Sequence, residues 1–292
     1  MKTEKSGQVL RLVMVLVGIL LLSRIANCHG SFRDSNASQP GTPAVTTSNL
    51  AMDPDDNQKN PLNHDIRLDP INCELPPISL DSPGQLQFVN ATVTCLRGAW
   101  LRALRDAHAF KPSLTTTDQE VTVYTVDTTR KSCGENTTAP TDAPLYCGGR
   151  QKILWPSKYA EFQNLRGQRL HGDMLFSVMH EYGHHVQFMT GVQAQADRMF
   201  GLWNEESSLG QQIHRRIELQ AQCLAGVAMA AAVQGGTVGR EEAEDVVDAQ
   251  QYVIEEPIHG SRAANLHWSR AGYDSGSAAA CNTWAADPAD VQ

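Results

Sequence analysis

Several features that would indicate other classes of protein are missing from these 292 residues. No stripe of Lys and Arg is interleaved with aromatic residues, so nucleic-acid binding has little support. No Gly-rich phosphate loop follows a predicted strand and no Gly-x-Ser-x-Gly sequence occurs, which argues against nucleotide and serine-hydrolase chemistry. The formal net charge is -8 and comes mainly from acidic runs such as residues 241–248. With 41% apolar and 19% charged residues, the chain has the composition of a globular protein.

The only long apolar run in the chain lies near its N-terminus. It covers residues 12–22, follows Arg11 and ends shortly before Arg24. This run is too short to cross a bilayer, which takes roughly 20 residues, and its length and basic flank are typical of a signal peptide. We therefore predict a signal peptide or lipoprotein signal over residues 1–28. An uncleaved anchor extending back to Val9 is the alternative, and both arginines count against it.

Seven cysteines leave one unpaired if the others form disulfides in an oxidising compartment. Cys28 is the natural odd residue, because the sequence Ile25-Ala26-Asn27-Cys28 resembles the processing site of bacterial lipoproteins. A lipidated Cys28 would anchor the mature protein to the outer face of the cell membrane. Asn27 departs from the small residue usual at that position, so ordinary cleavage and secretion is the alternative.

Composition divides the mature chain in two. Residues 29–66 are rich in Ser, Thr, Pro, Asn and Asp and show almost no apolar periodicity, which predicts a flexible tether. Residues 67–292 are predicted to form one folded domain.

Apolar periodicity within this domain predicts helices and two short strands. A helix is expected around the apolar face from Leu86 to Leu104, and three more are expected at about 173–189, 209–233 and 240–253. Strands are expected at about 121–125 and 152–155. The order of a helix, strands and then further helices predicts an α+β fold.

The helix predicted at about 173–189 carries an HExxH sequence, with His180, Glu181 and His184. Residues four apart lie one above the other on a helix, so both imidazoles can bind one metal ion. Glu181 then lies beside the metal, where it can take a proton from an activated water. The alternative is a helix whose histidines only line a polar groove.

Catalytic zinc normally has three protein ligands, so one more residue is needed. Glu218, on the following predicted helix, is the best candidate for a carboxylate ligand. His214 lies one turn earlier on the same face and competes with it, and Glu205 and Glu206 are weaker candidates.

Two stretches together resemble a known family. His180-Glu181-Tyr182-Gly183-His184-His185-Val186-Gln187 and Glu218-Leu219-Gln220-Ala221-Gln222-Cys223-Leu224-Ala225-Gly226 are similar to the neutral zinc metallopeptidases of bacteria, a zincin-like family. The likeness covers about residues 84–285. It implies a small sheet packed on an active-site helix with further helices, and Zn2+ held by His180, His184 and Glu218. It also implies that Glu181 is the general base of a peptidase.

The resemblance also bears on the cysteines. Together with sequence order it favours Cys133–Cys147 and implies Cys223–Cys281 and Cys73–Cys95. The competing interpretation makes Cys223 a fourth zinc ligand, which would close the site and make it structural.

One residue departs from the family. Gln222 stands where the family usually has Asp, one turn after the ligand Glu, and an uncharged amide there would weaken zinc binding or activity. We therefore expect an exported zinc peptidase acting on a peptide or protein substrate. The alternative is a weak or inactive metal-binding envelope protein that acts as a structural or docking module. His185, His259 and Tyr273 are candidates for assisting the reaction at the scissile carbonyl.

Overall fold

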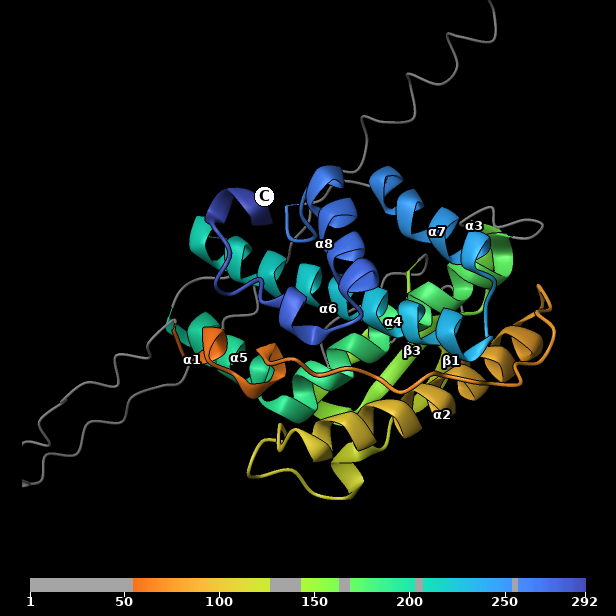
Figure 1. Cartoon of the computed structure of the whole chain (residues 1–292), viewed down its shortest axis with the longest axis horizontal. Coiled ribbons are helices and arrows are strands. Elements are labelled where there is room, and N and C mark those ends of the chain that lie inside the picture. The colour runs from red at the N-terminus through yellow and green to blue at the C-terminus, as the bar shows by residue number, and fades with distance from the viewer. Residues whose placement is uncertain (1–54, 127–142, 163–168, 203–206, 254–256) are drawn as a thin grey trace, which may run out of the picture. The chain divides into compact units, whose positions relative to one another are not determined.

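The computed structural model describes residues 55–126, 143–162, 169–202, 207–253 and 257–292. All of them belong to one compact unit, Asn49–Gln292. In chain order, the α-helices (α), 3-10 helices (η) and strands (β) are α1 Asp55–Gln58, η1 Pro61–Asn63, α2 Ser82–Asp106, η2 Thr117–Gln119, β1 Thr122–Val126, β2 Leu145–Cys147, η3 Gly148–Arg150, β3 Lys152–Pro156, α3 Tyr159–Phe162, α4 Arg169–Thr190, α5 Val192–Leu202, α6 Ser208–Gly235, α7 Arg240–Ala249, η4 Gln250–Tyr252, α8 Arg262–Ser275, η5 Ala278–Cys281 and η6 Pro288–Val291 (Figure 1).

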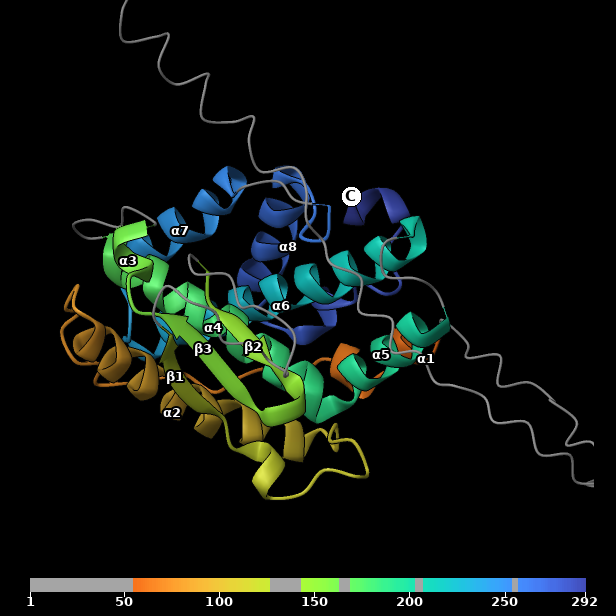
Figure 2. The ribbon, with the colours of Figure 1, turned by 180° about the vertical axis from the view of Figure 1, so that it is seen from behind.

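The three strands form a small mixed sheet in the order β1-β3-β2. β3 is parallel to β1, with Val123 opposite Ile153, and antiparallel to β2, with Tyr146 opposite Ile153. These three buried side chains share one face and join the main core. Figure 2 shows the sheet in front of α2 and α4, which cover one of its faces. The sheet thus packs on the helix that carries the HExxH sequence.

Local sequence explains where α2 begins and which side it buries. The side chain of Asp81 accepts a hydrogen bond from the backbone N–H of Gly84, which caps the first turn, and Pro83 lies within that turn. Val89, Leu96 and Trp100 on the predicted apolar face are fully buried. This face packs in the core, which fixes α2 beside α4.

Helices α4, α6 and α8 form the centre of the domain, and small residues let them approach closely. A Cβ on Gly272 of α8 would lie only 1.9 Å from the backbone oxygen of Cys223 on α6. A Cβ on Gly226 of α6 would lie 2.3 Å from the backbone oxygen of Ser269. These two glycines are therefore required where α6 and α8 lie side by side (Figure 1).

The packed domain begins before Arg67, so the predicted tether extends too far toward the C-terminus. Leu62 and Ile66 are buried in the main core. The side-chain amide of Asn57 donates to the backbone oxygen of Val192, 3.2 Å away, and Asn63 Oδ1 accepts from Gln220 Nε2 at 3.0 Å. A few well-placed apolar and amide side chains fix residues 55–66 despite a composition that favours disorder. The predicted signal segment and residues 29–54 of the predicted tether lie outside the described residues.

The predicted α+β class is confirmed, as are the helices and strands that correspond to α2, β1, β3, α4 and α6. The helix expected at about 240–253 ends at Ala249 and continues as the 3-10 helix η4. Strand β2 and helices α5 and α8 were not predicted.

Two predicted disulfides, Cys73–Cys95 and Cys223–Cys281, are confirmed. The interpretation of Cys223 as a zinc ligand is therefore wrong, because its sulfur is bonded to Cys281. Cys133, the predicted partner of Cys147, lies outside the described residues.

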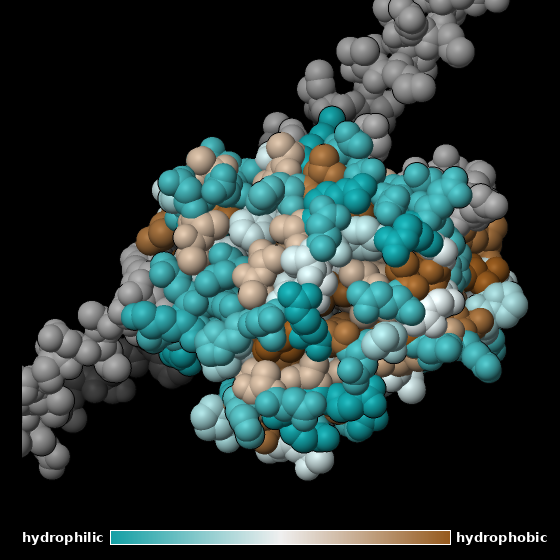
Figure 3. Space-filling model, in the orientation of Figure 1, coloured by the Kyte–Doolittle hydropathy of each residue, from teal (hydrophilic) through white to brown (hydrophobic). Residues whose placement is uncertain are grey.

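The surface seen in Figure 3 is mostly hydrophilic, and its hydrophobic residues form small separate patches. The exposed large hydrophobic residues Leu80, Tyr124 and Leu209 lie in three different parts of the chain. Within the described part of the chain, we find no helix that is both long and apolar enough to span a bilayer.

Candidate metal centre

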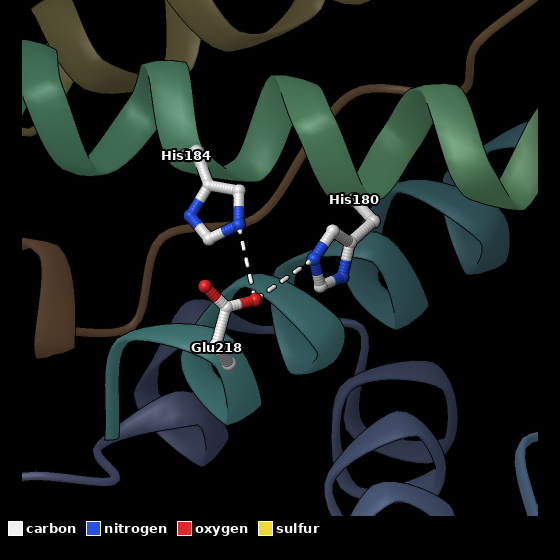
Figure 4. A group of neighbouring side chains, drawn as sticks. All are labelled: His180, His184 and Glu218. Atoms are coloured by element: carbon white, nitrogen blue, oxygen red, sulfur yellow. Dashed lines mark ion pairs between the residues drawn. The ribbon is translucent and has the colours of Figure 1, made fainter. Parts of the chain in front are cut away.

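Helix α4 brings the two histidines of the HExxH sequence onto one side. Its opposite side carries Leu175, Val178 and Tyr182, which are fully buried and hold the helix in the core. His180 and His184 lie one turn apart, with their ring centroids 4.9 Å from each other and their planes nearly perpendicular. Both imidazoles leave the helix toward α6 (Figure 4).

Helix α6 supplies the third side chain of this group. Glu218 Oε2 lies 3.4 Å from Nε2 of His180 and 3.4 Å from Nε2 of His184. All three ligand atoms lie within 4.8 Å of one another. The structure thus brings together the three residues that were predicted as metal ligands, and Figure 4 shows both rings directed at the same carboxylate oxygen.

These distances fit a zinc ion. Ligand atoms about 2.1 Å from zinc at tetrahedral angles lie about 3.4 Å apart. An N–H···O hydrogen bond would be shorter, usually about 2.7–3.2 Å. The two distances from Glu218 to the histidines therefore suit an ion between these side chains, and two imidazoles with one carboxylate are a donor set of catalytic zinc sites.

The Nδ1 atoms of both histidines have protein partners. His180 Nδ1 lies 2.9 Å from Gln222 Oε1, and His184 Nδ1 lies 2.9 Å from Gln187 Oε1. The Nε2 atoms are thereby left facing Glu218. Neutral amides thus occupy both places where a carboxylate often holds a metal-binding histidine.

Glu218 and His184 carry opposite charges in the metal-free protein. Burial alone would lower the pKa of His184, but the negative charge of the nearby Glu218 outweighs this effect and raises the pKa to about 9. Burial alone would raise the pKa of Glu218, but the charge of His184 and the nearby imidazole of His180 hold it well below its ordinary value.

Glu181 is also buried, on the part of α4 that faces strand β2. Burial raises the pKa of its carboxyl group, while the nearby His180 and His184 act in the opposite direction. The backbone of Tyr146 on β2 forms a hydrogen bond with this carboxylate. The small sheet thus positions the predicted general base.

A third histidine approaches the same carboxylate from the loop before α8. His259 Nε2 lies 3.7 Å from Glu218 Oε2, and its side chain is 43% exposed. The backbone oxygen of His259 accepts a hydrogen bond from Asn265, and Gly260 adopts a positive φ of 80° beside it. Of the three residues predicted to assist at the carbonyl, this one lies at the metal centre, and its role there stays a prediction.

The other candidates lie elsewhere. His185 is fully buried, with Nδ1 2.8 Å from the hydroxyl oxygen of Tyr146, and burial lowers its pKa to about 4. Tyr273 lies on α8, where its ring is near the guanidinium of Arg270. His214 stacks on Phe200, with ring centroids 4.2 Å apart, and does not join the metal group. Glu205 and Glu206 lie outside the described residues.

The sequence analysis singled out Gln222 behind the ligands, but it missed Gln187 and Gln250. Gln187 lies three residues after His184, a helical spacing from which the contact was predictable. Gln250 donates to the backbone oxygen of Val246 at 3.0 Å and accepts from Gln222 at 2.8 Å. Nothing in the sequence indicated this contact between η4 and α6.

Comparison with protein families gives a clear result. Residues 84–284 match the model of the family described as "Putative neutral zinc metallopeptidase". The chain belongs to this family. The predicted resemblance is confirmed, and membership implies a metal-dependent hydrolase with zinc as its metal. The match contains every element that forms the His-His-Glu group.

Two curated relatives of this chain come from Escherichia coli, strains K12 and O6:H1. Each is named "Uncharacterized protein YpfJ" and is 26% identical over 176 residues, which cover 53% of this chain and 58% of the relative. The chain thus spans less than two thirds of the length of these relatives. No solved structure matches the chain.

Proposed function

We propose that the protein is an exported peptidase that hydrolyses peptide bonds with water, using Glu181 as general base. The observation that carries this proposal is the arrangement of His180, His184 and Glu218 around one point, with Glu181 adjacent on the same helix. Family membership supports zinc as the metal that these three residues hold.

Zinc and Glu181 would have separate roles in the reaction. Zinc, when bound, supplies a Lewis acid that polarises a water and the scissile carbonyl. Glu181 accepts the proton that the attacking water loses and then delivers it to the departing amine. Burial raises the pKa of Glu181, which favours the protonated form that it adopts between the two proton transfers.

We place this activity outside the cytoplasm. The predicted signal over residues 1–28 supports export, and the disulfides Cys73–Cys95 and Cys223–Cys281 are of the kind that persists in oxidising compartments. Lipidation of Cys28 would attach the protein to the membrane. Mass spectrometry of the mature N-terminus separates a lipidated Cys28 from simple cleavage, and an uncleaved cytoplasmic chain would contradict export.

A second function is favoured by one observation. His180 is held by the uncharged Gln222 and not by a carboxylate, which weakens zinc binding. A metal-binding envelope module that docks a partner or stabilises the fold would tolerate this change. A non-catalytic module does not need a general base, so the presence of Glu181 favours the peptidase.

The deciding experiment compares the zinc-loaded protein with its Glu181→Gln variant on a diverse peptide library. We expect cleavage products from the wild type, and a loss of about 100- to 10,000-fold in kcat in the variant because proton transfer is removed. Zinc content is matched between the two proteins, so the comparison isolates the carboxylate. No products from either protein, with one zinc bound to each, would support the non-catalytic module.

A further inference from the structure

A chain of side-chain amides leads away from the metal centre behind His180. His180 Nδ1 contacts Gln222 Oε1 at 2.9 Å, and Gln222 Nε2 donates to Gln250 Oε1 at 2.8 Å. Gln250 Nε2 in turn donates to the backbone oxygen of Val246 at 3.0 Å. This chain joins α4, α6, η4 and the last turns of α7.

The chain has a fixed direction because a backbone carbonyl can only accept. Val246 O requires the amide nitrogen of Gln250, which turns Gln250 Oε1 toward Gln222. The nitrogen of Gln222 must then face Gln250, and its oxygen faces His180. His180 Nδ1 must therefore carry a proton, and the lone pair of its ring lies on Nε2, the atom that faces Glu218.

Burial makes this direction costly to reverse. The side chain of Gln222 is buried in the centre of α6, and that of Gln250 is half-buried. A flipped amide would place oxygen against oxygen at Gln250 and lose the hydrogen bond between the two side chains. Each amide therefore holds the orientation of the next.

The geometry points to Gln222 and Gln250 as positioning residues, forming an uncharged relay that fixes the tautomer and ring orientation of His180 for the metal. The relay rests on the proposed metal site but not on peptide cleavage. Gln250, four residues after the carbonyl that orients it, is the residue that sets the direction. The relay also leaves the metal centre without the negative charge that a carboxylate partner would add.

The test measures zinc affinity of the full chain by competition with a chromophoric chelator. We expect Gln222→Leu to weaken binding by about 10- to 100-fold, the usual effect of losing the partner of a metal-binding histidine. Gln250→Leu should weaken it by about fivefold, because Gln222 loses one hydrogen bond. The double variant should bind no more weakly than Gln222→Leu, since both changes break the same chain.

A neighbouring glutamine provides the matched control. Gln251 lies beside Gln250 in η4, and its side chain donates to the backbone oxygen of Asp248 at 2.9 Å, away from the metal group. Gln251→Leu should leave zinc affinity within about twofold of the wild type. Gln250→Glu loses the donor to Val246 O but keeps an oxygen that accepts from Gln222, so it should retain the zinc affinity that Gln250→Leu loses.

Nuclear magnetic resonance with 15N-labelled histidine gives a readout that a merely structural role would not change. The zinc-loaded wild type should show a slowly exchanging proton on His180 Nδ1, and this proton should exchange faster in Gln250→Leu. Zinc binding and proton exchange that are unchanged in Gln250→Leu would overturn the relay, even if Gln222→Leu fails to fold. If the relay variants change zinc binding as expected but the protein cleaves no peptide, the proposed peptidase function is refuted and the relay is not.

Discussion

His185 ionises differently from an exposed histidine. Its imidazole is fully buried, next in sequence to His184, and contacts the hydroxyl of Tyr146. Burial lowers its pKa from 6.5 to about 4. Between these two values the unfolded chain binds more protons than the folded one, so folding stability must fall as the pH falls.

We therefore expect His185 to contribute to acid sensitivity. Its contribution is complete above pH 6.5 and is lost as the pH falls toward 4, because only the unfolded state accepts the proton. From pH 6.5 to 5 the wild type should lose about 2 kcal/mol more than His185→Asn. Urea unfolding of both metal-free proteins at several pH values measures this difference, and equal pH dependence would contradict it.

The sequence allowed the group around the metal to be anticipated only in part. His180 and His184 follow from helical spacing, and Glu218 was one of several candidates until the resemblance favoured it. The contact of Gln250 with Gln222 could not be predicted from the sequence, because it depends on how η4 packs on α6. A hydrogen bond between side chains 28 residues apart leaves no periodic trace.

At the scale of whole elements, the separation of α4 and α6 determines whether the histidines and Glu218 can share an ion. Gly183 lies between the two histidines, and a Cβ there would lie 3.0 Å from the backbone oxygen of Ala221. Ala221 is three residues after Glu218 on α6. An added methyl group would therefore push Glu218 away from both imidazoles.

The variant Gly183→Ala should weaken zinc binding by roughly tenfold, because a displacement of a few tenths of an ångström is enough to disturb a metal site. Gly98→Ala is the matched control, since a Cβ at exposed Gly98 on α2 meets nothing within 4 Å. The control should keep its zinc affinity and gain up to about 1 kcal/mol of stability. Chelator competition and thermal unfolding test both variants, and equal zinc affinities would show that helix separation is not limiting.

The elements that periodicity missed share a physical reason. α8 buries Ala264, Asn265, Ser269 and Gly272 along with larger residues, so its packed side is small and partly polar. Such a face shows no apolar stripe, although it packs closely on α6. β2 has only three residues and depends on its pairing with β3. Long helices with a large apolar face, such as α2, were predictable because burial alone determines them.

At the scale of the whole domain, the disulfide Cys223–Cys281 joins α6 to the C-terminal segment across 58 residues. The loop that it closes contains α7 and α8, so the bond restricts a large part of the unfolded chain. Helix α6 carries Glu218 five residues before Cys223. The crosslink thus connects the stability of the C-terminal third to the helix of the metal group.

Removing this crosslink should cost about 4 kcal/mol of folding stability by the loop-entropy relation. The change is Cys223→Ala together with Cys281→Ala, which leaves no free thiol at the site. Guanidinium unfolding of the double variant and of the wild type measures the loss. A double variant as stable as the wild type would mean that the C-terminal segment is held by packing alone.

The hydrogen bond between Asn63 and Gln220 has a mechanical consequence. Gln220 lies two residues from Glu218, and its Oε1 accepts from the Gln187 amide that holds His184. A pull at the N-terminal end of the described chain would therefore reach both sides of the metal group through two side-chain contacts. The covalent path from Asn63 to α4 runs through more than a hundred residues, whereas this path crosses only two side-chain hydrogen bonds.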